Sequence, residues 1–297
     1  MRLLGSWDLP GHCGPVYALV CDYERNVLYS GGSDGLIAEW RCVSGKQVRA
    51  IAHTPAAIYA LHWMASHKQL YVGQSNGVVY VLDLAQRKVI RAIQAHQSAV
   101  FGLSSHPQQV EGWSSGRDGY FLFWDTARAE PYASIKVTPA GLRGFVLVLR
   151  EERFLTAGRD GNVYEISRET KSVTRSISVE PHFVFTLQVS PQSAFVATGG
   201  RSGMLKIWDI QMQLLWESPA HNLTLTGLAW HPAGRILASG GRDRYIHLWD
   251  TYNREKCLTL EGHKRSVNTL LWTTPETLVS AGDDGLIKIW HLEGLPA

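Results

Sequence analysis

Cysteine is scarce in this chain, and long apolar runs are absent. Only four cysteines occur among 297 residues, and none forms a Cys-x-x-Cys pair or a metal-ligand spacing with histidine. We therefore expect reduced thiols, no metal site and no cofactor. No apolar run reaches the roughly 18 residues that a membrane helix needs, so we expect no membrane insertion. Because residues 1–12 also lack a secretory signal, the sequence predicts a cytoplasmic protein.

The catalytic motifs that are easiest to read from a sequence are missing as well. There is no GxxxxGK[ST] loop, no GxGxxG that opens a helix and no GxSxG elbow. The net charge is +3, with 20 arginines against 9 lysines, which is too small to indicate a nucleic-acid-binding protein by itself. We predict no catalytic residues and no enzymatic activity.

One segment recurs seven times along the chain. Each copy has a small residue or glycine, a turn, five residues of alternating character and an apolar anchor. The copies read SGGSDGLIAEW (30–40), VGQSNGVVYVL (72–82), SSGRDGYFLFW (114–124), TAGRDGNVYEI (156–166), TGGRSGMLKIW (198–208), SGGRDRYIHLW (239–249) and SAGDDGLIKIW (280–290). The anchors stand 41 or 42 residues apart, which indicates an internal repeat.

The repeat predicts an all-β fold. Each unit reads as short strands of alternating polarity between turns rich in Gly and Asp, and the Asp-Gly and Asn-Gly pairs suit hairpin turns with positive φ. A repeat of about 40–45 residues with four strands is the unit of a β-propeller. A single four-stranded sheet cannot bury both of its faces, whereas sheets stacked in a ring can. We predict one domain over residues 1–297, a closed ring of seven four-stranded antiparallel blades.

The first strand of the chain is expected to complete the last blade. Only seven residues follow Trp290, too few for another strand, whereas the residues before His12 match the register of CLTLEGH (257–263). We therefore expect residues 2–9 to pair with the C-terminal blade and to seal the ring, so that deleting them would expose a sheet edge.

Two further features give the chain a family resemblance. A Gly-His or Ala-His pair stands about 22 residues before the turn, at 11–12, 52–53, 95–96, 220–221 and 262–263, and a Trp-Asp pair stands at 124–125, 208–209 and 249–250. The chain thus resembles the WD40-repeat family over essentially its whole length. The resemblance implies a buried hydrogen-bonded tetrad in each complete blade. Four blades have all members: His12, Ser30, Asp34, Trp40; His96, Ser114, Asp118, Trp124; His221, Ser239, Asp243, Trp249; and His263, Ser280, Asp284, Trp290.

Three blades depart from the tetrad pattern. Blade 2 keeps only His53 and Asn76, blade 4 has Thr138 at the His position, and blade 5 has Glu180 there. We expect these blades to depend more on apolar packing and to be looser. The Ser, His and Asp sets of the other blades could also be read as catalytic triads, but they recur with the blade period, which favours a structural role.

Arginine stands just before the turn in four consecutive blades, at Arg117, Arg159, Arg201 and Arg242. In the WD40 architecture this turn shares a face with the His-bearing connections, the face most often used for partners, and we call it the top face. His182, Phe183, Lys264 and Arg265 on neighbouring connections would extend this surface. Such an arc would bind carboxylates or phosphates through bidentate hydrogen bonds. The alternative is a row of solvated arginines.

Aromatic residues follow β-branched residues in four of the predicted innermost strands: VYAL (16–19), IYAL (58–61), VFGL (100–103) and VFTL (184–187). Neighbouring side chains of a strand face opposite ways. If the Val or Ile packs between blades, the other set points toward the central channel: Tyr17, Tyr59, Phe101 and Phe185, with Arg143 at the equivalent place in blade 4. These residues could fill the channel mouth or capture an inserted side chain.

The sequence therefore predicts a non-catalytic interaction scaffold, monomeric by itself, that binds a protein or peptide partner of acidic character on the top face. The alternative is binding of nucleic acid or phosphate groups by the same arginines. The modest net charge argues against that alternative, and a steep dependence on salt would reveal it.

Overall fold

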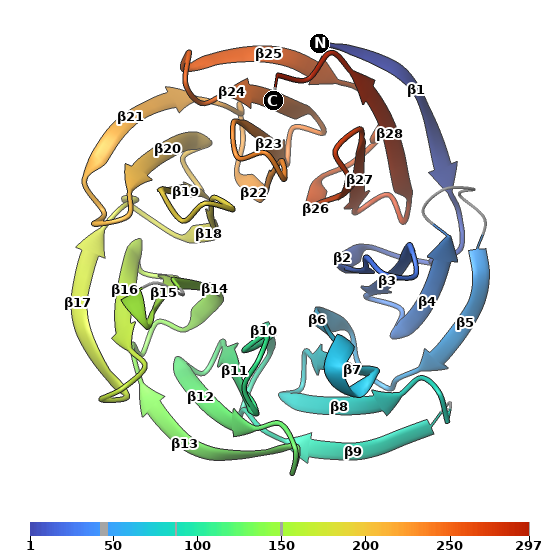
Figure 1. Cartoon of the computed structure of the whole chain (residues 1–297), viewed down its shortest axis with the longest axis vertical. Helices are drawn as coiled ribbons and strands as arrows, with labels where there is room; N and C mark the ends of the chain where they lie inside the picture. The colour runs from blue at the N-terminus through green and yellow to red at the C-terminus, as the bar shows by residue number, and fades with distance from the viewer. Residues whose placement is uncertain (42–46, 87, 149–150, 297) are drawn as a thin grey trace.

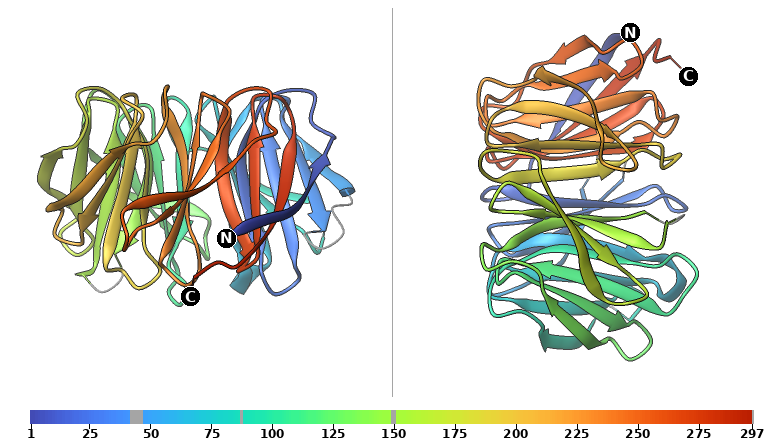
Figure 2. Two further views of the ribbon diagram at one scale, coloured as in Figure 1. Left: turned by 90° about the horizontal axis from the view of Figure 1, so that it is seen from above. Right: turned by 90° about the vertical axis from the view of Figure 1, so that its left-hand side faces the viewer.

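The computed structural model describes residues 1–41, 47–86, 88–148 and 151–296. Seven four-stranded antiparallel sheets form a ring of blades around a central opening (Figure 1). Seen from the side, the ring is a flat disc with turns on both of its faces (Figure 2). The all-β, seven-bladed prediction is confirmed. Within the described ranges, no helix is long and apolar enough to cross a membrane.

Each of the first six blades consists of four consecutive strands, ordered from the ring centre outward. Blades 1 to 3 contain β2 (Val16–Asp22), β3 (Val27–Gly32), β4 (Leu36–Arg41) and β5 (Gln47–His53); β6 (Ile58–Met64), β7 (Gln69–Gln74), β8 (Val78–Asp83) and β9 (Lys88–Gln94); β10 (Val100–Ser105), β11 (Glu111–Gly116), β12 (Tyr120–Asp125) and β13 (Glu130–Lys136). A short 3₁₀ turn, η1 (Ala65–His67), connects β6 to β7.

Blades 4 to 6 repeat this arrangement. They contain β14 (Leu142–Val148), β15 (Arg153–Gly158), β16 (Asn162–Ser167) and β17 (Ser172–Ser178); β18 (Val184–Val189), β19 (Phe195–Gly200), β20 (Met204–Asp209) and β21 (Leu214–Pro219); β22 (Leu225–Trp230), β23 (Ile236–Gly241), β24 (Ile246–Asp250) and β25 (Glu255–Leu260).

Blade 7 is built from both ends of the chain. β26 (Val267–Thr274), β27 (Thr277–Gly282) and β28 (Ile287–Glu293) supply the inner strands, and β1 (Arg2–Leu9) supplies the outermost one. β1 runs antiparallel to β28 from the pair Arg2–Glu293 to the pair Leu9–Ile287. The two termini consequently lie near each other at the rim (Figure 1). The predicted closure by residues 2–9 is confirmed, and it covers the edge that β28 would otherwise expose.

The core lies between blades, because each sheet packs its face against the next sheet. Between blades 3 and 4, the Trp113 ring lies 4.8 Å from the Phe154 ring, and both side chains are fully buried with Phe121. Between blades 7 and 1, Val279 and Ile289 pack in one cluster with Leu28. Burying such side chains contributes about 1.5–3 kcal/mol each, which favours a closed ring over separate blades.

The turn between the second and third strands of each blade needs a left-handed residue. Six of these turns use glycine, with φ between 71° and 89°. At Gly77 an added Cβ would lie 2.0 Å from the His96 carbonyl oxygen, so only glycine fits there. In blade 6 the position is taken by Arg244, whose φ is 78°.

Candidate partner-binding surface and channel

The structure brings together the four members of each complete tetrad. In blade 3, His96 Nδ1 lies 3.0 Å from Asp118 Oδ1, His96 Nε2 lies 2.8 Å from Ser114 Oγ, and the Trp124 indole N–H donates to Ser114 Oγ at 2.9 Å. The tetrads of His12, His221 and His263 have the same connections, with every spacing between 2.7 and 3.1 Å. Burial raises the pKa of the Asp118 carboxyl, but hydrogen bonds from His96 and backbone N–H groups outweigh it and hold the pKa below 3.8.

These tetrads contain the connections of a catalytic triad, but the hydroxyl cannot reach a substrate. Ser30, Ser114, Ser239 and Ser280 are fully buried. The oxygen of each already accepts the indole N–H of its own tryptophan. A nucleophile must be exposed to attack, so the tetrads hold the top-face turns in place and perform no catalysis.

The three incomplete blades use other side chains at the histidine position. In blade 2 the residue there is Thr54, not His53: Thr54 is buried and its hydroxyl donates to the Gly35 carbonyl at 3.0 Å, whereas His53 is exposed. The sequence interpretation of His53 was wrong by one residue, because it followed the Ala-His pair and not the distance to the turn.

Blade 4 has a hydroxyl group, and blade 5 a carboxylate, at the position of the histidine. In blade 4 the Thr138 hydroxyl donates to Asp160 at 2.8 Å, and the Tyr164 hydroxyl donates to the same carboxylate at 2.6 Å. In blade 5, Glu180 is buried and faces the Lys206 ammonium at 3.8 Å, while its Oε1 forms no hydrogen bond within the described residues. The prediction that these blades are looser stays a prediction.

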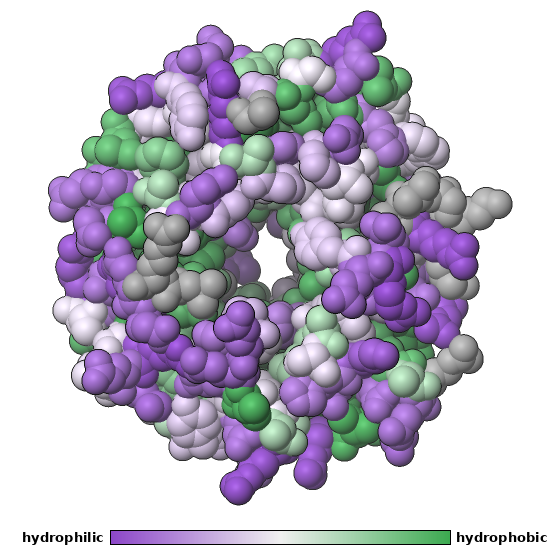
Figure 3. Space-filling view, in the orientation of Figure 1, coloured by the Kyte–Doolittle hydropathy of each residue, from purple (hydrophilic) through white to green (hydrophobic). Residues whose placement is uncertain are grey.

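A β-bulge in the innermost strand pair of every blade aims one side chain at the central channel. The pairing register shifts at the start of the strand each time, for example between Val16 and Ala18, so that Tyr17 has no partner across the ladder; in blade 4 the shift skips two residues, Arg143 and Gly144. Bulges re-aim side chains in this way. The seven bulge residues are Tyr17, Tyr59, Phe101, Arg143, Phe185, Thr226 and Asn268, and all of them line one cavity of about 510 Å³. The opening persists when side chains are drawn in full (Figure 3).

The channel aromatics form a continuous row that ends on an arginine. The Tyr59 ring lies 4.9 Å from the Tyr17 ring and 5.2 Å from the Phe101 ring. The Arg143 guanidinium then lies 4.4 Å from the ring centroids of both Phe101 and Phe185. Burial, followed by the positive charges of Arg159 and Arg117, lowers the pKa of Arg143 to about 10, so this group stays charged at neutral pH. The row is a mixed aromatic and cationic wall.

The four arginines of the predicted arc occupy equivalent turns. Their backbone N–H groups donate to the preceding connection in the same way, at 2.8, 3.0, 3.1 and 2.9 Å for Arg117, Arg159, Arg201 and Arg242. Three are exposed, while Arg159 is half-buried and stacks 5.1 Å from the Phe183 ring. Arg117 and Arg159 line the channel cavity, but Arg201 and Arg242 do not. The arc therefore has an inner half at the channel and an outer half on the top face.

The remaining predicted site residues lie on the top-face connections. His182, Lys264 and Arg265 are exposed, and Lys264 donates its backbone N–H to Asp284. Sequence reasoning missed two features of the site, Gln188 and the stacking of Arg143 between rings. The stacking carries no local signal, because its two rings come from blades 3 and 5. Among the cysteines, Cys13 and Cys257 are free thiols, and Cys42 lies outside the described residues.

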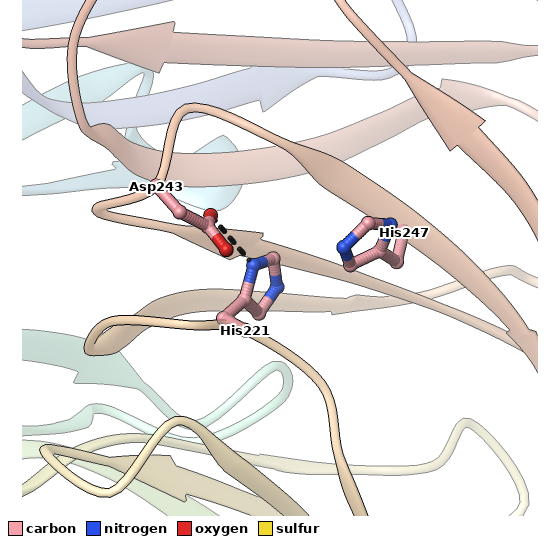
Figure 4. Close-up of side chains that lie close together, drawn as sticks. All are labelled: His221, Asp243 and His247. Atoms are coloured by element: carbon pink, nitrogen blue, oxygen red, sulfur yellow. Dashed lines mark hydrogen bonds and ion pairs between the residues drawn. The ribbon is translucent and has the colours of Figure 1, made fainter.

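One cluster in blade 6 contains residue types that bind metals. Ligand atoms of His221, Asp243 and His247 lie within 4.8 Å of one another (Figure 4). Both His221 nitrogens are engaged in the tetrad, and its ring stacks on His247 with centroids 4.7 Å apart and planes inclined by 28°. Lone pairs of stacked imidazoles lie in near-parallel planes and do not converge on one ion. The cluster is an extension of the tetrad.

The ring and its tetrads define a β-propeller of the WD type. The family model described as WD domain, G-beta repeat matches residues 3–41, and the one described as Anaphase-promoting complex subunit 4 WD40 domain matches residues 187–275. Both matches agree with the repeat that runs through all seven blades. In these two segments, which together cover less than half of its length, the chain is similar to WD40-repeat proteins.

Several curated proteins are similar to this chain. The 66 kDa stress protein of Physarum polycephalum is 25% identical over 301 residues, covering 96% of this chain and 47% of that protein. Nuclear distribution protein PAC1 of Ajellomyces capsulatus is 36% identical over 86 residues, and Anaphase-promoting complex subunit cdh1 of Dictyostelium discoideum is 29% identical over 142 residues. These two matches cover 28% and 46% of this chain and 19% of each relative, so the chain spans less than half of the relatives it matches.

Proposed function

We propose that this propeller is a non-catalytic scaffold that holds an acidic segment of a partner protein on its top face, across blades 3 to 6. The observation that supports this most is the arc of four arginines on equivalent turns. None of the four side chains forms an ion pair with any residue in the described part of the chain. A rigid row of unpaired guanidinium groups is complementary to a row of carboxylates.

The apolar contacts would come from the phenylalanines next to the arc. Phe183 and Phe185 lie 6.2 Å apart in an edge-to-face arrangement, half-exposed beside Arg159. Rigid aromatic side chains beside arginine are typical of the residues that dominate binding energy at interfaces. The names of two relatives, a subunit of a complex and a nuclear distribution protein, are consistent with a protein that works in an assembly.

The test is binding of a fluorescein-labelled hexaglutamate peptide, measured by anisotropy. The double variant Arg201→Glu, Arg242→Glu is expected to bind at least tenfold more weakly with unchanged thermal stability, because both side chains are exposed. The matched control, Arg91→Glu with Arg254→Glu, reverses two exposed arginines outside the arc and should bind normally. Equal binding by the arc variant and the control would remove the proposal. Tighter, steeply salt-dependent binding of oligothymidylate would favour the nucleic-acid alternative.

A further inference from the structure

Outside the channel, every partly buried arginine among the described residues is paired with a carboxylate. Arg49 lies 2.9 Å from Glu39, Arg235 lies 2.8 Å from Asp250, and Arg168 lies 2.6 Å from Glu111. Arg153 contacts two carboxylates and a backbone carbonyl. A buried charge is costly unless it is paired, and this protein follows that rule outside the channel.

The channel mouth breaks this rule at the partly buried Arg143 and Arg159, and the exposed Arg117 lines the same cavity beside them. Arg117, Arg143 and Arg159 line the same cavity, no acidic side chain lines it, and none of the three makes an ion pair with a described residue. The Asp283 carboxylate lies close enough to Tyr17 to help raise the pKa of its phenol, but it already accepts a hydrogen bond from the Asn268 amide at 2.7 Å. Among the described residues, these three neighbouring cations therefore have no carboxylate as an ion-pair partner.

The contacts of Arg143 favour a negatively charged ligand group in the channel. Its guanidinium carbon lies 4.4 Å from the ring centroids of both Phe101 and Phe185, so these two aromatic surfaces already hold a cation of the chain itself. The N–H groups of a guanidinium lie along its edge, and five donors are present there. An arginine held in this way presents fixed donors to an acceptor in the channel, and little side-chain freedom remains to be lost on binding.

The charge of the ligand group follows from a comparison with the three positive charges of Arg117, Arg143 and Arg159. One carboxylate supplies a single negative charge and leaves most of the repulsion among the three arginines unrelieved. A phosphate monoester carries about −1.5 to −2 charges at pH 7 and offers three strong acceptor oxygens. Arginine is also the side chain whose geometry matches phosphate best.

We infer that the mouth of the channel is a socket for one phosphorylated side chain of the partner, held by Arg143, Arg117 and Arg159. The neighbouring wall of Tyr17, Tyr59 and Phe101 would contact the residue that flanks the phosphate. This inference rests on the proposed function and adds a regulatory condition to it, because the partner would dock fully only after phosphorylation.

The test compares three labelled heptapeptides with the sequence Ala-Ala-Ala-X-Ala-Ala-Ala, in which X is phosphoserine, aspartate or serine. The phosphoserine peptide is expected to bind the full-length protein at least tenfold more tightly than the other two. Arg143→Gln should reduce its affinity at least tenfold. Arg117→Gln changes an exposed side chain, so it keeps the test valid if loss of Arg143 disturbs packing, and it should cost at least threefold. Arg91→Gln on the outer strand of blade 2 is the control and should bind like wild type.

Four outcomes would overturn the socket. The first two are equal affinities of the phosphoserine and aspartate peptides, and equal affinities of Arg143→Gln and wild type for the phosphoserine peptide. The other two are inorganic phosphate that binds as tightly as the phosphoserine peptide, and oligothymidylate that binds more tightly than the peptide and depends on Arg143. Hexaglutamate binding separates the two proposals. If hexaglutamate binds through Arg201 and Arg242 while the phosphoserine peptide shows no preference, the socket fails and the scaffold proposal stands. If neither peptide binds, both fail.

Discussion

Blades 1, 3, 6 and 7 differ from blades 2, 4 and 5 in the side chains beneath the turn but share the backbone hydrogen bond that holds the turn. The hydrogen bond from the turn to the preceding connection recurs in both groups, for example from Ser33 to Pro15 at 2.8 Å and from Ser75 to Ala57 at 2.8 Å. In one group a hydrogen-bonded relay of Trp, Ser, His and Asp supports this bond. In the other group Thr54, Thr138 or Glu180 takes the place of histidine. The backbone of a blade thus accepts different polar residues at the histidine position, provided that the buried polar groups there find hydrogen-bond or ionic partners.

The largest expected effect comes from removing the hydroxyl at the centre of a complete tetrad. Ser114→Ala leaves the buried Trp124 indole N–H and one His96 nitrogen without a partner, and we expect a loss of about 3 kcal/mol in the free energy of unfolding. Thr156→Val in blade 4 is the matched change, because no indole or imidazole depends on Thr156, and it should cost less than about 1 kcal/mol. Urea unfolding at pH 7 measures both. Equal losses would mean that the tetrad adds nothing to blade 3.

Acid should act on blade 6 before it acts on the other complete blades. Burial lowers the pKa of His247 from 6.5 to about 4, and burial also lowers the pKa of His221, against the opposing effect of Asp243. A histidine with a lowered folded-state pKa contributes stability that is present above pH 6.5 and is lost as the pH falls toward 4. We expect a loss of about 2 kcal/mol over this window.

The measurement is the urea midpoint between pH 7 and pH 4. His247→Gln should make the profile less steep, because it removes one titrating ring; His221 and also His62, whose own pKa burial lowers to about 4, retain their share of the slope. The carboxylates of Asp34, Asp118 and Asp284 are held below pKa 3.8, so their contribution is lost only at still lower pH. An unchanged slope in the His247 variant would show that other groups control the acid sensitivity.

Blade 5 can be converted into a complete blade. Thr198 already accepts the Trp208 indole N–H at 2.9 Å, so Glu180→His together with Ser202→Asp supplies the two missing members. The pair should stabilise the protein by about 1 kcal/mol, since it removes a buried carboxylate oxygen that has no hydrogen-bond partner and only a long, 3.8 Å contact with Lys206. Glu180→His alone should not stabilise, because the histidine would have no carboxylate. A double-mutant cycle from thermal melts tests this, and additive effects would contradict it.

The smallest effect concerns the turn of blade 6. Arg244 has φ of 78° where six other blades have glycine, and left-handed conformations cost a non-glycine residue roughly 1–2 kcal/mol. Arg244→Gly should therefore raise the free energy of unfolding by about 0.5–1 kcal/mol, after allowing for the greater freedom of glycine in the unfolded chain. The same urea experiment measures it, and a destabilised variant would show that the Arg244 side chain contributes more than its turn costs.

Much of this arrangement was visible in the repeat. The spacing of anchors such as Trp124 and Trp208 predicts the number of blades, and the register of residues 2–9 predicts the closure, because both depend on periodicity. The position of Thr54 was open to the same reasoning, since it stands 22 residues before Asn76. The placement of Arg143 between two rings was not, because it depends on how three separate blades converge at the axis. The division of the arginine arc into inner and outer halves also depends on the direction of each side chain at equivalent turns. The sequence repeat does not predict that direction.

The pairing of β1 with β28 sets an order on assembly. β1 is synthesised before the other strands of the ring and must remain without its partner until the segment near residue 293 has been made, so the ring can close only after synthesis of almost the whole domain. Up to that moment the growing chain exposes two unpaired edges. A force applied to the two neighbouring ends would act directly on the β1–β28 pair. We expect the ring to open first at this pair.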